Sequence, residues 1–212
     1  MIPNAYCELV YNKDYELLIA TMLSAQTTDK RVNMVTKNLF SKYSLDQIAE
    51  LDVEVIENII KPIGTFRKKA NYLKKIAISL INDYNGRVPN DRQYIESLPG
   101  CGHKTCNVVL SNLYNENCIA VDTHVSRVAK RLNLVDQQDD VKIIEKKLTR
   151  IFNFTSLKDI HHRIVLFGRY ICTSKSPDCN KCLLKEYCKK HRQNIWQCFF
   201  SLIHLLRLVV QK

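Results

Sequence analysis

Four cysteines near one end of the chain have side chains that could bind a metal. They stand in the segment CTSKSPDCNKCLLKEYC with the spacing C-x6-C-x2-C-x5-C, as Cys172, Cys179, Cys182 and Cys188. Thiolates so spaced hold either a tetrahedral zinc ion or an iron–sulfur cluster. Structural zinc sites usually pair two short C-x2-4-C knuckles, whereas here a single C-x2-C pair is flanked by wider gaps. The spacing therefore favours a [4Fe–4S] cluster, whose irons take one thiolate each at well-separated positions.

A disulfide is the alternative use of such cysteines, and the N-terminal sequence argues against it. MIPNAYCELVYNKDYELL has no charged region followed by an apolar core and a cleavage site, as a secretory signal would. We therefore expect a reducing compartment, where clustered thiols usually bind metal. Because the segment 172–188 is mostly polar, we expect the cluster to complete the fold rather than to do redox work. The other cysteines are interpreted as buried apolar thiols: Cys7, Cys101, Cys106, Cys118 and Cys198.

A lysine beside a glycine-rich turn is a candidate nucleophile. The segment LPGCGHKTCNVVL (98–110) places Gly100 and Gly102 just before a predicted helix that begins near His103, with Lys104 in its first turn. Amides at a helix N-terminus bind phosphate without reading a base, and glycine lets the backbone approach a ligand closely. The helix dipole disfavours a cation there, and an uncharged amine can form a Schiff base with a sugar aldehyde. An ordinary helix–helix turn with an idle lysine is the alternative.

Asp122 lies in AVDTHVSRVAKRL (120–132), just before another predicted helix. Its structural interpretation is an N-cap that accepts a hydrogen bond from the amide of His124 or Val125. Its chemical interpretation is a carboxylate that stabilises positive charge on an oxocarbenium-like sugar or transfers protons. The residues alone favour the cap.

The charge of the chain points to a polyanionic partner. The 212 residues include 32 Lys+Arg against 21 Asp+Glu, a net charge of +11. Such an excess suggests nucleic acid as a partner, or else an anionic membrane surface. The alternative is that a biased genome composition accounts for part of the excess of lysine. The segment KPIGTFRKKANYLKK (61–75) holds six basic residues and no acid, which predicts a basic helix face. No apolar run reaches the ~18 residues of a membrane span, and we expect the apolar stretch 195–210 to pack on the protein.

Helices must position these residues, because apolar side chains recur at helical spacing almost throughout and no alternating strand pattern is convincing. Only 5 Gly and 5 Pro are present, fewer than turn-rich β folds use. We therefore predict an all-α fold, with Asp14 available as the N-cap of the first helix. The predicted helices cover residues 14–26, 28–43, 44–51, 53–60, 65–84, 91–98, 103–115, 123–132, 139–152 and 156–171.

Taken together, these segments resemble the endonuclease III family, the helix–hairpin–helix DNA glycosylases with a [4Fe–4S] cluster. The resemblance extends from about residue 3 to 190. The matching segments, besides the cysteine array, are LSAQTTD (23–29), LPGCGHKTCNVVL (98–110), VDTHVSRV (121–128) and HHRIVLFGRYIC (161–172). The family's fold implies two helical domains that flank a DNA-binding cleft. These are a six-helix domain with the hairpin at 6–118 and a cluster domain at 119–192 with residues 1–5, followed by an apolar tail at 193–212.

The resemblance also implies an activity, namely base excision repair. The enzyme would remove oxidised pyrimidines from duplex DNA and then cleave the strand at the abasic site by β-elimination. Lys104 takes the position of the nucleophilic lysine and Asp122 that of the active-site aspartate, while Gln26 matches a residue pushed into the gap left by the extruded nucleotide. The other implied DNA contacts are Thr65, Gly100, Gly102, Thr105 and Lys175. We expect a cytoplasmic monomer, associated with the nucleoid in a prokaryote, neither secreted nor bound to a membrane.

Some features depart from the family pattern. A bulky apolar wedge often follows the glycine at 64, but here Thr65 does, which leaves Ile63 and Phe66 as other wedge candidates. The loop TSKSPD after Cys172 is less basic than usual, with Lys175 opposed by Asp178. In the family a leading helix normally packs into the cluster domain, and we expect this chain to lack most of it. We expect residues 195–210 to cover the surface that this leading helix would otherwise cover. The alternative is that a truncated or frameshifted gene accounts for these differences.

Two other functions stay open. One is a monofunctional mismatch glycosylase of the same superfamily, and the other is a non-catalytic iron–sulfur protein that binds DNA or carries electrons. The mismatch class usually lacks the lysine found here at 104. In addition, the 24 residues after Cys188 are too few for the extra domain of its adenine-specific branch.

Overall fold

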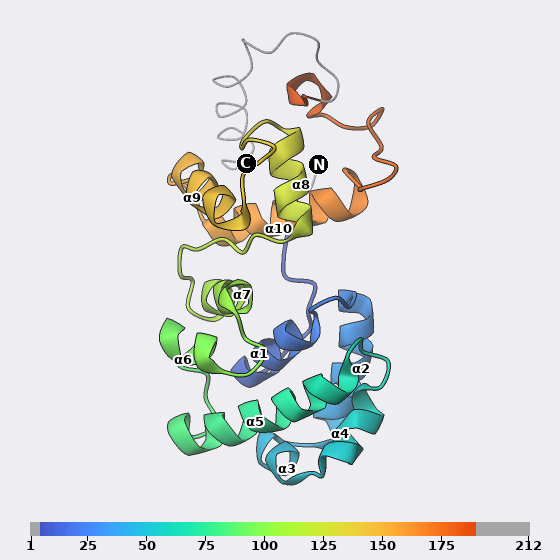
Figure 1. Ribbon diagram of the computed structural model, residues 1–212, viewed down its shortest axis with the longest axis vertical. Helices are drawn as coiled ribbons and strands as arrows, with labels where there is room; N and C mark the ends of the chain where they lie inside the picture. Colours follow the sequence, from blue (N-terminus) through green and yellow to red (C-terminus); the bar gives the residue numbers. More distant parts are fainter. Residues whose placement is uncertain (1–4, 190–212) are drawn as a thin grey trace. The chain divides into compact units, whose positions relative to one another are not determined.

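The computed structural model describes residues 5–189 of the chain (Figure 1). Within that range the backbone forms ten α-helices, one short 3-10 helix and no strand, which confirms the predicted all-α class. None of the helices in this part of the chain has the length and apolar character needed to span a bilayer. The apolar stretch 195–210 and Cys198 lie outside the described residues.

The chain divides into two compact units. The first, Cys7–Asn115, is called the hairpin unit here because it contains the Gly100–Gly102 turn. The second is called the cysteine unit and consists of the described parts of Met1–Tyr6 and Glu116–Lys212.

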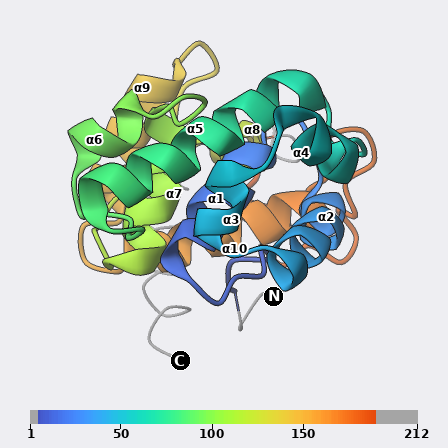
Figure 2. The same cartoon turned by 90° about the horizontal axis from the view of Figure 1, so that it is seen from below.

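The hairpin unit is built around one buried helix. Its helices are α1 (Asp14–Leu23), α2 (Asp29–Lys42), α3 (Leu45–Glu50), α4 (Val53–Ile60), α5 (Phe66–Tyr84), α6 (Arg92–Ser97) and α7 (His103–Leu113). Every residue of α1 from Tyr15 to Leu23 is buried, including the polar Glu16 and Thr21, and most of them are apolar, as expected of a helix in the core. It contacts α2, α5 and α7 (Figure 2).

The long helix α5 forms the other support of this unit. It packs against α1, α3 and α4 through a stripe at helical spacing, formed by Ala70, Leu73, Ile76, Ala77 and Leu80, all buried. The helix ends where Asn85 and Gly86 take positive φ values of 50° and 78°. The amide of Gly86 donates to the Leu80 carbonyl at 2.8 Å, the usual way to close a helix with a left-handed residue.

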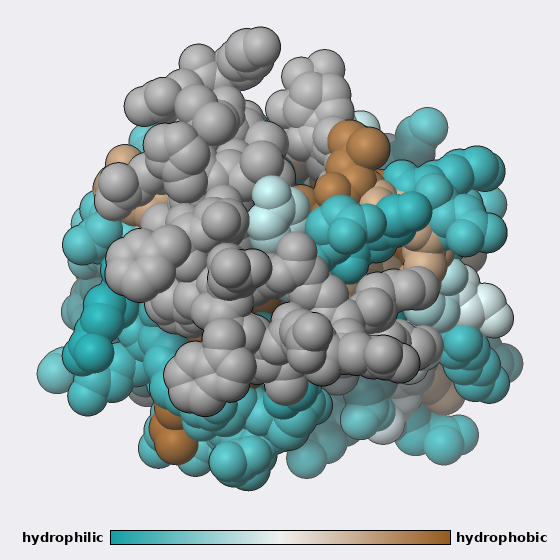
Figure 3. All heavy atoms as spheres, turned by 90° about the horizontal axis from the view of Figure 1, so that it is seen from above, coloured by the Kyte–Doolittle hydropathy of each residue, from teal (hydrophilic) through white to brown (hydrophobic). Residues whose placement is uncertain are grey.

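The cysteine unit is smaller and is organised by α8 (Thr123–Arg131), α9 (Val141–Ile151) and α10 (Leu157–Tyr170), followed by the 3-10 helix η1 (Lys185–Tyr187). Helix α8 packs against both α9 and α10. A Cβ atom at Gly168 of α10 would lie 3.1 Å from both His124 Cβ and Val128 Cγ2, so the glycine permits the close approach of α8. Figure 3 shows that the visible described side chains on the face it draws are mostly hydrophilic, with hydrophobic residues in a few separate places.

All ten predicted helices form, with small differences at their ends. The largest is in α1, which ends at Leu23 rather than at residue 26. The prediction of Asp14 as the N-cap is wrong, because Lys13 holds that position and Asp14 is the first helical residue. The Asp14 carboxylate instead accepts a hydrogen bond from the distant amide of Val88 at 2.9 Å.

Candidate functional site

The hairpin between α6 and α7 has two glycines that serve different purposes. Gly100 has a φ of +80°, and a Cβ atom there would lie 2.7 Å from Tyr72 Cδ2 and 3.1 Å from Met22 Cγ. Backbone conformation and packing therefore both require glycine at this position. Gly102 has a φ of −85°, and a Cβ atom there would meet nothing within 4 Å. The fold itself thus does not require glycine at 102, and the space beside it is open.

Lys104 stands beside this open space, in the first turn of α7. Its side chain is exposed, and the neighbouring Thr105 is half-buried. First-turn amides of a helix have no intrahelical acceptor, and the N-cap residue, Gly102, has no side chain to bond them. This helix end can therefore accept an anion, with an amine beside it.

A polar network braces the hairpin from the side of α6. The Glu96 carboxylate lies 2.9 Å from Nδ1 of His103 and 3.3 Å from the guanidinium of Arg92. Arg92 also donates to Oδ1 of Asn107 at 2.8 Å. Because His103 and Asn107 belong to α7, the network joins the ends of two helices that the hairpin connects.

Asp122 caps α8 in the cysteine unit. Its Oδ1 atom accepts a hydrogen bond from the amide of Val125 at 2.7 Å, which confirms the predicted N-cap. The side chain is half-buried, and the cap fixes the direction in which the carboxylate points. The cap and a chemical role are compatible, because the bond uses one of the two carboxylate oxygens.

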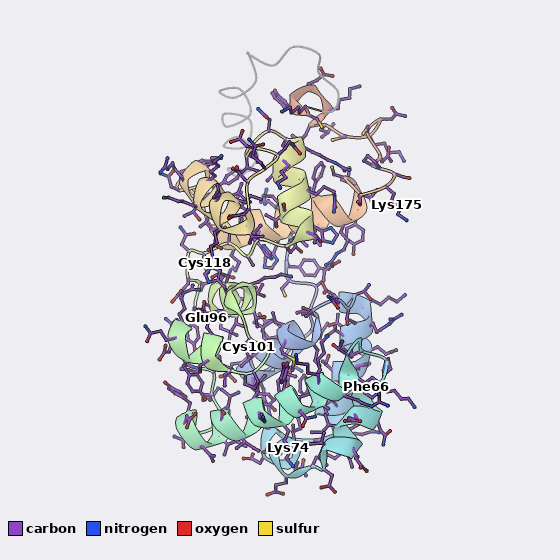
Figure 4. All side chains as sticks on the ribbon, in the orientation of Figure 1. Phe66, Lys74, Glu96, Cys101, Cys118 and Lys175 are labelled. Carbon is purple, nitrogen blue, oxygen red and sulfur yellow. The ribbon has the colours of Figure 1, made fainter. Side chains whose placement is uncertain are left out.

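Two loops of the hairpin unit carry Gln26 and Thr65, and both residues have the left-handed conformation, with φ values of 57° and 55°. The loops are neighbours, since a Cβ atom at Gly64 would lie 3.8 Å from the Gln26 carbonyl oxygen. Both side chains are exposed. Ile63, an alternative wedge candidate, is only 1% exposed, so that expectation is wrong. Phe66 is half-buried, with the Arg67 guanidinium 5.1 Å from its ring centroid (Figure 4).

The basic run 61–75 is not one solvated face. Lys69 is only 5% exposed, and its ammonium donates to the carbonyls of Leu23 and Ala25 at 2.8 and 2.6 Å. Burial lowers the pKa of Lys69. Lys74 also turns inward, donating to the Leu51 carbonyl at 2.7 Å (Figure 4). The exposed basic residues of the run are Lys61, Arg67, Lys68 and Lys75.

The four cysteines of the array come together around one hollow of the cysteine unit. Arg131, Phe167 and Lys185 are among the other residues that line it. The pKa of the Cys182 thiol is raised, first by burial and then by the three other thiols, so Cys182 lies within electrostatic reach of each of them. Among residues 5–189, no three His, Cys, Asp or Glu side chains converge as ligands of a single metal ion. Four thiols around one hollow are a donor set that fits either an iron–sulfur cluster or a zinc ion.

Two arginines of α8 hold the start of the cysteine segment. Arg131 donates to the Cys172 sulfur at 3.3 Å and to the Thr173 carbonyl at 2.7 Å. Arg127 donates to the Cys172 carbonyl at 3.2 Å and to that of Gly168 at 2.7 Å. The sequence pattern had not singled out either arginine, because their acceptors lie more than 40 residues away.

Lys175 is exposed in the loop that follows (Figure 4). Asp178, expected to oppose it, pairs instead with Lys181 at 3.4 Å. Of the remaining cysteines, Cys101 and Cys106 are buried as predicted, whereas Cys7 and Cys118 are half-buried. Burial raises the pKa of the Cys101 thiol to about 12, so this cysteine is unreactive.

Comparison with known proteins identifies the family. A family model described as "HhH-GPD superfamily base excision DNA repair protein" matches residues 19–154. Endonuclease III of Rickettsia felis is 44% identical over 194 residues, which is 91% of each chain. Two solved structures are each 45% identical over 90% of both chains: a non-covalent endonuclease III–DNA complex (TM-score 0.86) and a trapped endonuclease III–DNA covalent intermediate (TM-score 0.84). The chain therefore belongs to the endonuclease III family, within the HhH-GPD superfamily of base excision DNA repair proteins.

Proposed function

We propose that this protein removes oxidised pyrimidines from duplex DNA and then cleaves the strand at the resulting abasic site. The observation that carries the proposal is the exposed amine of Lys104, placed in the first turn of α7 directly after the open Gly102 backbone. A similar protein, an endonuclease III, has been trapped on DNA as a covalent intermediate. A lysine at such a position is the group expected to form that bond.

Lys104 acts as the nucleophile. Its amine attacks C1′ of the damaged nucleotide, the bond between C1′ and the base breaks, and the base departs with its electron pair and takes up a proton. The adduct then loses one proton from Nζ, and the nitrogen lone pair breaks the bond between C1′ and the ring oxygen, which takes up a proton. The product is a protonated Schiff base between Nζ and C1′. This cation makes a proton on C2′ acidic, and removal of that proton expels the 3′-phosphate by β-elimination.

Asp122 stabilises the positive charge that develops on the sugar and assists proton transfer. Its bond to the Val125 amide at 2.7 Å supports this role, since it holds the carboxylate in one orientation.

The hairpin binds the DNA strand. The loops that carry Gln26 and Thr65 occupy the place of the extruded nucleotide. First-turn amides of α7, including that of Thr105, bind a phosphate that approaches over Gly102. Gln26 enters the gap in the duplex and Thr65 contacts the DNA beside it. Extrusion costs a few kcal/mol of stacking, least for a damaged base, which aids selection.

Exposed cations supply the affinity that does not depend on sequence. Lys68 is the best placed of these, because its ammonium lies 5.6 Å from the centroid of the Tyr72 ring, the same ring that packs against Gly100. Lys61, Arg67, Lys75 and Lys175 are exposed as well. Binding should weaken with salt by a log–log slope of about −0.9 per phosphate contacted.

The four array cysteines, Cys172, Cys179, Cys182 and Cys188, are proposed to bind a [4Fe–4S] cluster. Bound there, it supplies folding free energy to a segment with little core of its own. Arg131 then donates a hydrogen bond to the sulfur of one ligand, Cys172. The protein is proposed to work in the cytoplasm as a monomer.

Borohydride trapping tests the reaction. Borohydride reduces a Schiff base to a stable amine, so the wild-type protein should become linked to duplex DNA with one abasic site. Lys104→Ala should lose this product, and Lys74→Ala, a control that also removes one positive charge, should retain it. Trapping that survives in Lys104→Ala refutes the nucleophile. Base removal without strand cleavage by the wild type supports a monofunctional glycosylase instead.

A further inference from the structure

A buried lysine links the two loops that carry Gln26 and Thr65. The ammonium of Lys69 donates to the carbonyls of Leu23 and Ala25 at 2.8 and 2.6 Å. The backbone amide of Lys69 donates to the Thr65 carbonyl at 3.1 Å. The second bond is an ordinary main-chain bond in the first turn of α5, so the side chain of a residue one helical turn after Thr65 bonds to the chain immediately before Gln26.

The burial of this cation calls for a specific role. Lysine is almost never fully buried unless its charge is compensated, and Lys69 is only 5% exposed. Here the compensation comes from the C-terminal end of α1, where carbonyl oxygens carry the negative end of the helix dipole. Because one of the two acceptors, Ala25, lies beyond the helix, the lysine also fixes the loop that follows.

The backbone conformation at Gln26 and Thr65 is unusual for residues of their type. Five non-glycine residues have positive φ in the described part of the chain: Gln26, Thr65, Asn85, Asn115 and Asn133. Asparagine tolerates this region, whereas a β-branched residue there is an outlier that must be held by its surroundings. The two residues that are not asparagine are the two that Lys69 connects.

Gln26 is held on both sides while its side chain stays exposed. On one side is the Ala25 carbonyl, bound by Lys69. On the other, the Gln26 carbonyl oxygen faces the Gly64 backbone, 3.8 Å from where a Cβ atom would stand. The amide of Thr27 also donates to the Ser24 carbonyl at 3.0 Å, which closes residues 24–27 into a tight turn.

We propose that Lys69 is a positioning residue, whose side chain holds the backbone before Gln26 so that Gln26 enters the duplex in one conformation. This rests on the proposed function, because it assigns to Lys69 a part in filling the gap that the extruded nucleotide leaves. The role is specific to duplex DNA, since a single strand has no such gap.

Lys74 offers a matched control on the same helix. It also directs its ammonium at a main-chain carbonyl, that of Leu51 at 2.7 Å, where α3 ends. Replacing either lysine by methionine removes one charge and leaves carbonyls without their donor. Only the Lys69 replacement releases the loop of Gln26.

The experiment compares Lys69→Met, Lys74→Met, Gln26→Ala and the double variant Gln26→Ala/Lys69→Met as full-length, iron-loaded proteins. Each is given a duplex with one oxidised thymine and, separately, a single strand with one abasic site. Lys69→Met should slow excision from the duplex about tenfold, as expected for a misplaced group. Borohydride trapping on the single strand should stay within about twofold of the wild type, because chemistry at Lys104 does not depend on the gap. Lys74→Met should change neither rate, and Lys69→Met should add little to the loss caused by Gln26→Ala.

Equal losses on the duplex and the single strand, or losses that multiply in the double variant, overturn the proposal. Lys69→Arg, which keeps a donor for each carbonyl, should recover most of the duplex activity, and Lys69→Gln takes the place of Lys69→Met if that variant does not fold. In that case wild-type behaviour of Lys69→Gln, which cannot reach both carbonyls, overturns the proposal as well. Wild-type protein that is inactive on both substrates contradicts the proposed function itself, which is a different result from a defect confined to Lys69→Met.

Discussion

The Glu96 carboxylate lies 2.9 Å from Nδ1 of His103, so the last turn of α6 is bound directly to the first turn of α7. The hairpin between them is thereby closed by side chains as well as by its own backbone. His103 precedes Lys104, and the contact therefore helps to fix the helix end at which the proposed chemistry occurs.

This contact predicts a pH-dependent contribution to stability. The hydrogen bond with His103, assisted by Arg92, lowers the pKa of Glu96 below its ordinary value of 4.5. A carboxylate whose pKa is lower in the folded protein stabilises the fold above its unfolded pKa, and the contribution is lost as the pH falls through the folded pKa. Glu96→Gln should thus be less stable than the wild type by less than about 1 kcal/mol near neutral pH, since both groups are partly exposed. The difference should vanish well below about pH 4. Urea denaturation from about pH 6 to about pH 3 checks this, and a pH-independent difference contradicts it.

The two hairpin glycines should respond differently to alanine. Gly100→Ala combines a strained φ with a clash against Tyr72 and should destabilise the protein by about 1–3 kcal/mol. Gly102→Ala should cost at most about 1 kcal/mol, because its Cβ enters open space and alanine is only a poorer N-cap. It should nevertheless weaken binding to abasic DNA about tenfold, because the methyl group occupies the approach of a phosphate. Thermal melting and equilibrium binding separate the two effects, and unchanged affinity in Gly102→Ala contradicts phosphate binding at the hairpin.

Two substitutions of Asp122 separate its role as the N-cap of α8 from its proposed role in catalysis. Asparagine is as good an N-cap as aspartate, so Asp122→Asn should melt like the wild type, whereas Asp122→Ala should lose about 1 kcal/mol. Both should lose at least about 100-fold in base excision, since neither has a carboxylate. Retention of activity in Asp122→Asn would show that the residue is only a cap.

The cysteine array should bind iron and depend on it for its structure. Cys182→Ser should lose iron and visible absorption and should melt at a lower temperature than the wild type, because metal binding contributes to folding. Cys118→Ser changes a half-buried thiol that does not line the hollow and should keep its full iron content. Iron analysis measures the metal content of each variant, and circular dichroism measures its melting temperature. Full iron content in Cys182→Ser contradicts the assignment of Cys182 as a ligand.

Salt dependence should distinguish lysines that contact DNA from those that support the fold. Lys68→Ala should reduce the log–log slope of binding against salt by about 0.9, the value for one lost phosphate contact. Lys74→Ala should leave the slope unchanged, because that ammonium already serves the Leu51 carbonyl. Equal slopes for the two variants would show that Lys68 makes no phosphate contact.

The helices and some of their ends could be predicted from sequence because their causes are local. The stripe on α5 repeats at helical spacing, the stop at Asn85-Gly86 has the required left-handed residues, and the cap of α8 by Asp122 uses an amide three residues ahead. The order of the motifs likewise sufficed to recognise the family, which the family model and the relatives confirm.

Long-range contacts to main-chain atoms could not be predicted in this way. Lys69 reads as one member of a basic run, yet its acceptors lie 46 and 44 residues earlier in the chain. Any residue type can supply a carbonyl oxygen, so no sequence pattern marks the partner. One of the two acceptors, Leu23, is the last residue of α1, so the lysine binds the end of that helix.

The left-handed backbone at Gln26 and Thr65 has a consequence for how tightly the protein holds its ligand. Threonine explores fewer backbone states than glycine, and here the rare state is already selected when the chain folds. The strain, about 1–3 kcal/mol for each such residue, is therefore incurred once, before any DNA is met. A preorganised loop of this kind loses little further freedom on association, so more of its contact energy remains available as affinity.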